Sequence, residues 1–153
     1  MRQSSVLVAA ATLILLTACG GDPTGPVKSN GRRMSARIDG AAWNAISVAT
    51  DSVVPSLIVI TGTMGTQTLT ISIPADQGPG TQTVGSTTPL FGVLVVGAQS
   101  WMASRTQGGA GSLTLTTVAP GHVAGTFEFT LAAHDGASPG TRRVSSGEFD
   151  VTY

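Results

Sequence analysis

The longest alternating segment of this chain reads Val123-Ala124-Gly125-Thr126-Phe127-Glu128-Phe129-Thr130-Leu131. Large apolar residues and one glycine occupy every second position, and small, polar or acidic residues occupy the positions between them. Successive side chains of a β-strand point to opposite faces, so this period of two predicts a strand with one face in a core. The segment therefore predicts a protein built from β-strands.

The end of the chain repeats this pattern after a turn-rich loop. The inward positions of its last strand are expected to hold Phe149, Val151 and Tyr153. Val144 is out of step with that face, and a one-residue slip in a strand turns every following side chain to the other face. One extra residue near Ser146-Gly147 would restore the register, which predicts a β-bulge there.

Shorter segments upstream give the same signal. Strands are expected at 34–38, 46–50, 56–61, 68–73, 81–84, 90–96 and 112–118, and residues 99–104 are expected to form either an edge strand or an irregular turn. The unbroken apolar run at 57–60 is typical of a central strand covered on both faces. Asp39-Gly40 predicts a hairpin, because a type I′ turn needs positive φ at both central residues.

Domain organisation follows from these patterns. No segment after the first 18 residues has a helical period, and parallel strands would need long crossover connections. Residues 34–153 are therefore expected to form one antiparallel β-domain of about eight or nine strands, either a β-sandwich or an open β-barrel. Residues 19–33 are rich in Gly, Pro and small polar residues, which is typical of a flexible tether.

The first 18 residues have the three parts of a secretory signal peptide. Arg2 supplies the basic start, residues 6–16 form an apolar run, and small residues precede a cleavage point between Ala18 and Cys19. The apolar run is too short to cross a bilayer as a helix, which needs about 20 residues. An uncleaved membrane anchor is the weaker alternative.

The stretch Leu16-Thr17-Ala18-Cys19 resembles a bacterial lipobox. In that pattern the Leu and the small Ala direct a peptidase to cut at a Cys that already carries a diacylglycerol. The resemblance implies that Cys19 is the lipidated N-terminus of a mature protein in the cell envelope. Gly20, in place of the Asp that retains such proteins in the inner membrane, implies the outer membrane. The alternative is an ordinary secreted protein with an incidental cysteine.

Two further segments resemble a family of small uncharacterised bacterial lipoproteins. These are the tail, residues 125–131 followed by Ser146-Gly147-Glu148-Phe149-Asp150, and the start of the domain, Ile38-Asp39-Gly40-Ala41-Ala42-Trp43. The likeness implies an all-β fold and an envelope location. It implies no activity and no catalytic residue.

Charge and composition restrict the partners. Charged residues make up 10% of the chain, far below the usual quarter, and 21 Thr and 15 Ser supply much of the polar surface. Without Arg2 the mature chain has seven basic and eight acidic residues, so it lacks the basic footprint of a nucleic-acid-binding protein. The expected partners are the membrane, through the N-terminal lipid, and another envelope protein or a glycan.

Catalytic and metal-binding patterns are weak. His122 and His134 are the only histidines, both lie in or beside expected turns, and no G-x-S-x-G nucleophile motif is present. Two isolated histidines and scattered carboxylates match neither zinc spacings nor a calcium loop. The sequence predicts a protein that is not an enzyme, with no metal site and no cofactor.

Two roles remain for such a domain. The first is a structural or protein-interaction module, in which Trp43 closes one end of the core. The second is small-ligand binding, in which Trp43, Trp101 and Tyr153 stack on a carbohydrate or a peptide. Exposure of these rings discriminates the two: two of them on one open face would favour a binding module, and burial of all three would favour a scaffold.

Overall fold

The structure is a computed structural model that describes residues 31–54, 57–85, 89–136 and 138–153. Within these residues the protein is all-β and contains no helix. The strands are β1 (Arg33–Ile38), β2 (Ala41–Asn44), β3 (Ser47–Val54), β4 (Leu57–Met64), β5 (Gln67–Pro74), β6 (Gly80–Thr83), β7 (Gly92–Val96), β8 (Gln99–Ala103), β9 (Ala110–Ala119), β10 (His122–Ala133) and β11 (Thr141–Thr152).

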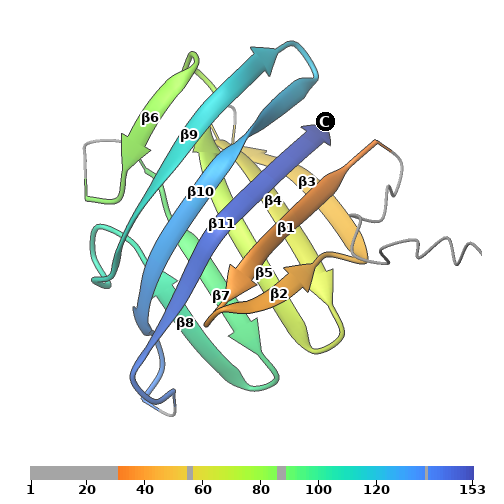
Figure 1. Cartoon of the computed structure of the whole chain (residues 1–153). Coiled ribbons are helices and arrows are strands. Elements are labelled where there is room, and N and C mark those ends of the chain that lie inside the picture. The colour runs from red at the N-terminus through yellow and green to blue at the C-terminus, as the bar shows by residue number, and fades with distance from the viewer. Residues whose placement is uncertain (1–30, 55–56, 86–88, 137) are drawn as a thin grey trace, which may run out of the picture.

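All the strand pairs belong to one antiparallel sheet. Nine strands follow one another in the order β2-β1-β11-β10-β8-β7-β5-β4-β3, and the sheet curls into a half-barrel (Figure 1). The two ends of this path come together where β2 runs into β3: the Ala45 amide donates to the Met34 carbonyl of β1, and the Ile46 amide donates to the Thr63 carbonyl of β4. The open-barrel form of the expected fold is confirmed.

The sheet branches at β10. One edge of this twelve-residue strand pairs with β11, while its other edge pairs with β9 over residues 122–130 and with β8 over residues 132–133. Strand β6 then extends the branch by pairing with β9. The branch gives two layers, with β9, β10, β11, β1 and β2 in front and β3, β4, β5, β7 and β8 behind (Figure 1).

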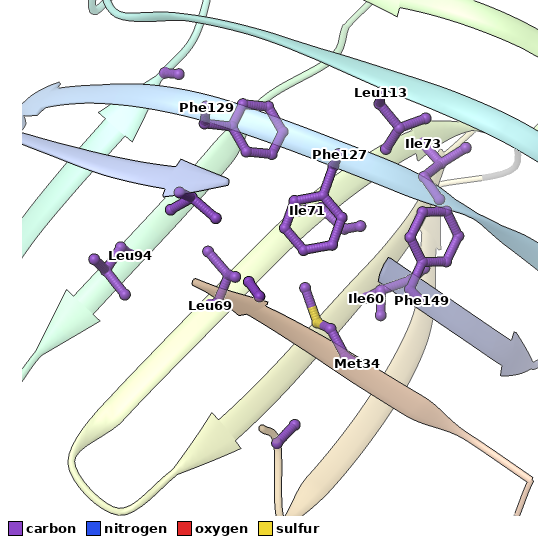
Figure 2. Close-up of a cluster of buried hydrophobic side chains, with 14 of the residues drawn as sticks. Met34, Ile60, Leu69, Ile71, Ile73, Leu94, Leu113, Phe127, Phe129 and Phe149 are labelled. Carbon is purple, nitrogen blue, oxygen red and sulfur yellow. The ribbon is translucent and has the colours of Figure 1, made fainter. Parts of the chain in front are cut away.

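The core lies between these two layers (Figure 2). Full burial of a large apolar side chain contributes roughly 1.5–3 kcal/mol to folding, so this cluster is the main source of stability. Figure 2 labels ten of its members: Met34, Ile60, Leu69, Ile71, Ile73, Leu94, Leu113, Phe127, Phe129 and Phe149.

Each inward phenylalanine of β10 and β11 lies opposite a glycine of a neighbouring strand. The register gives three such pairs: Phe127 with Gly147, Phe149 with Gly125, and Phe129 with Gly111. A Cβ atom at any of these glycines would overlap the opposing ring. The Gly-x-Phe spacing of both strands therefore serves packing, since antiparallel pairing sets the Phe of one strand over the Gly of the other.

The bulge predicted in β11 is confirmed. Across β10, the three residues from Phe127 to Phe129 face the four residues from Gly147 back to Val144. The same extra residue appears against β1, where Ser35 pairs with Glu148 and Arg37 pairs with Ser145. Ser146 has a φ of 50°, in the left-handed region, as expected for an extra residue that reverses the facing of a strand.

The Asp39-Gly40 hairpin is also confirmed, with φ of 51° and 84° at its two central residues. Partial burial acts to raise the pKa of Asp39, but hydrogen bonds from the Arg143 amide and the Arg142 guanidinium outweigh it, so this pKa lies below its ordinary value. Both bonds reach the Asp39 carboxylate from β11. They fix the β1–β2 turn to the start of the neighbouring strand β11.

Three expectations of strand structure are wrong in detail. Strand β3 continues through Asp51, and β8 is an interior strand between β7 and β10. The apolar run at 57–60 is covered on one face only, with Ile58 and Ile60 buried and Leu57 and Val59 partly exposed. A single curled sheet covers its inner face and leaves its outer face open. Residues 55 and 56, between β3 and β4, lie outside the described residues.

Candidate functional site

Two of the three aromatic residues considered for ligand binding are core residues. Trp43 is 1% exposed and Trp101 is 0% exposed. The ring of Trp43 covers Gly62 of β4, where an added Cβ would lie 2.7 Å from it. Its indole N–H has no hydrogen-bond partner among the described residues. The interpretation of Trp43 as a packing residue is confirmed, and the ligand-stacking interpretation of both tryptophans is wrong.

Two polar groups contact the indole of Trp101. Its indole N–H donates to the Pro139 carbonyl at 3.1 Å, and the guanidinium of Arg142 lies 4.5 Å from the ring centroid. Arg142 also forms an ion pair with Asp39 at 2.7 Å. The Arg142 cation therefore bridges the indole and the β1–β2 turn.

Tyr153 is the one exposed ring of the three, with 42% of the residue accessible. Its backbone amide donates to the Gly121 carbonyl, so the residue continues the β10–β11 pairing past the last strand. The inward position expected for it is wrong, because this end of the barrel is open. A single exposed ring forms no aromatic platform.

His122 lies beside a carboxylate at the same end of the barrel. Its Nε2 atom is 2.8 Å from Oδ1 of Asp150, and Arg33 reaches Oδ2 of the same carboxylate at 3.2 Å. All three side chains are partly exposed. The group combines the Arg33–Asp150 ion pair with the His122–Asp150 hydrogen bond and joins β1, β10 and β11. Sequence reasoning missed it because His122 and Asp150 are 28 residues apart.

His134 is exposed in the loop between β10 and β11, and the neighbouring Asp135 carries the ordered contacts. The Asp135 carboxylate accepts hydrogen bonds from the amide and the hydroxyl of Ser100, at 2.9 and 2.8 Å. Hydrogen bonds from Ser138 and Ser100 lower the pKa of Asp135 from 3.8 to about 2. The carboxylate fixes the loop against β8.

This contact predicts a pH dependence of stability. The pKa of Asp135 is lower in the folded state, so its contribution is present above the unfolded pKa near 3.8 and is lost as the pH falls toward about 2. We expect the urea midpoint of the wild type to fall over this range more steeply than that of Asp135→Asn, with Ser138→Ala in between. Identical pH profiles of the three proteins would show that the loop contact does not form.

A hollow lies on the outside of β9, β10 and β11. Two adjoining depressions of about 400 and 380 Å³ share Ser112 and Glu128, and together they form the outer groove. Glu128 and Glu148 supply two carboxylates, and Arg143 supplies a cation at one end. The remaining lining side chains are mostly hydroxyls of Ser and Thr, so the groove suits a polar ligand or a protein surface.

Outside this groove, the function also depends on whether the described part of the chain could bind a metal ion or cross a membrane. No cluster of three or more His, Cys, Asp or Glu residues is placed to hold a metal ion there. The residues that the structure describes include no helix long and apolar enough to cross a membrane. Ala18 and Cys19 lie outside the described residues, so the lipidation and cleavage sites stay predictions from the sequence.

The fold and its surface define a class: a single-sheet β half-barrel with a polar outer groove. Residues 30–150 match the model of a family described as a domain of unknown function, DUF6252. The match covers most of the chain, and the chain belongs to this family. The resemblance to an uncharacterised domain family is confirmed. Neither the curated proteins nor the solved structures include a match to this chain.

Proposed function

We propose that this chain is a lipid-anchored protein of the cell envelope, without enzymatic activity, whose half-barrel is a structural or protein-interaction module. The observation that carries this proposal is the use of the aromatic side chains: Trp43 and Trp101 stabilise the core, while most of the described outward side chains of both layers are exposed or half-exposed. A surface of this kind suits contact with another macromolecule more than stacking on a small ligand.

The anchor in this proposal is Cys19. Two or more acyl chains hold a protein stably at a bilayer, with about 0.8 kcal/mol for each buried CH₂ group. The segment from Cys19 to the start of β1 at Arg33 is rich in Gly and Pro, and a Gly-rich random coil of this length has an average span of about 20 Å. The module therefore stays close to the membrane surface. Gly20 supports the outer membrane as its location.

Fatty-acid labelling tests the anchor. Cells that express the full chain are grown with an alkyne-bearing fatty acid, and the wild type is compared with Cys19→Ala. We expect label on a wild-type protein that fractionates with membranes, and no label on the variant. Ala18→Ser, which keeps a small residue before the cleavage point, is the matched control and should retain the label. Equal labelling of wild type and Cys19→Ala would contradict the proposed anchor.

Small-ligand binding is the second candidate, and the outer groove supports it. Its hydroxyls and two carboxylates offer hydrogen-bond acceptors to a carbohydrate or to a basic peptide. Screening the mature chain against glycan and peptide arrays tests this role. Binding that is lost in Glu128→Gln would favour small-ligand binding over a purely structural or protein-interaction role. Arrays without any signal would rule out small-ligand binding for those ligand classes.

A further inference from the structure

We draw no further inference here: the strongest candidate, the pair of exposed carboxylates of Glu128 and Glu148 in the outer groove, belongs to the site already described, and nothing else among the described residues points to what would bind it.

Discussion

Gly147→Ala is expected to lower the free energy of unfolding by about 2 kcal/mol, a large loss for a substitution of one methyl group. Gly147 lies opposite Phe127, and a Cβ atom at this position would overlap the ring. The ring is 4% exposed and packed between the two layers, so it has little room to move away. Urea unfolding at neutral pH measures the change.

Gly136→Ala is the matched control for this substitution. Gly136 has no heavy atom within 4 Å of an added Cβ, and its φ lies outside the left-handed region. We expect this variant to be as stable as the wild type, or more stable by a few tenths of a kcal/mol, because alanine restricts the unfolded chain. Equal effects of the two alanine substitutions would contradict the role of the Phe–Gly pairs.

A double-mutant cycle separates this overlap from a general intolerance of the strand. Phe127→Ala is expected to cost about 3–5 kcal/mol through the cavity it creates. In the double variant the Gly147→Ala methyl group no longer meets a ring, so the combined loss should be smaller than the sum of the two separate losses. Strict additivity would mean that the two residues do not pack against each other.

Deletion of Ser146 is expected to preserve cooperative folding. The bulge lets Val144 and Phe149 share the inner face, although they are five residues apart. Without the extra residue they are four apart, the spacing at which a regular strand places two side chains on one face, so the pairing with β1 and β10 need not slip. Circular dichroism in a urea titration should show a single steep transition, as in the wild type.

Ser146→Gly is the matched variant, because it keeps the bulge and relieves its backbone strain. Ser146 has a φ of 50°, which costs a residue with a side chain about 1 kcal/mol and costs glycine little. We expect the substitution to raise stability by up to that amount. A deletion variant that unfolds over a broad, low transition would contradict this interpretation of the extra residue.

The features that the sequence predicts well are local ones. Alternation identifies the strands from β9 to β11, the out-of-step Val144 locates the bulge, and Asp39-Gly40 identifies the first hairpin. Each depends on residues a few positions apart, where φ preferences and side-chain facing act directly. Local signals of this kind persist in the folded chain because the tertiary structure agrees with them.

Features that depend on distant pairing were beyond sequence reasoning. Strand β8 gains its interior place from only two paired residues at the end of β10, and no pattern in 99–104 indicates this. The outer groove and the His122–Asp150 contact both form from segments brought together by the sheet. The burial of Trp43 and Trp101 is likewise decided by neighbours, chiefly Gly62 and the loop before β11.

The central claim is that the indole rings of this protein stabilise a half-barrel and leave its outer faces for contact with other macromolecules. Iodide quenching of tryptophan fluorescence in the native mature chain tests it most directly, because iodide reaches only exposed rings. We expect blue-shifted emission and almost no quenching from Trp43 and Trp101, with strong quenching after unfolding in urea. Native emission that iodide quenches as strongly as that of the unfolded chain would contradict the claim.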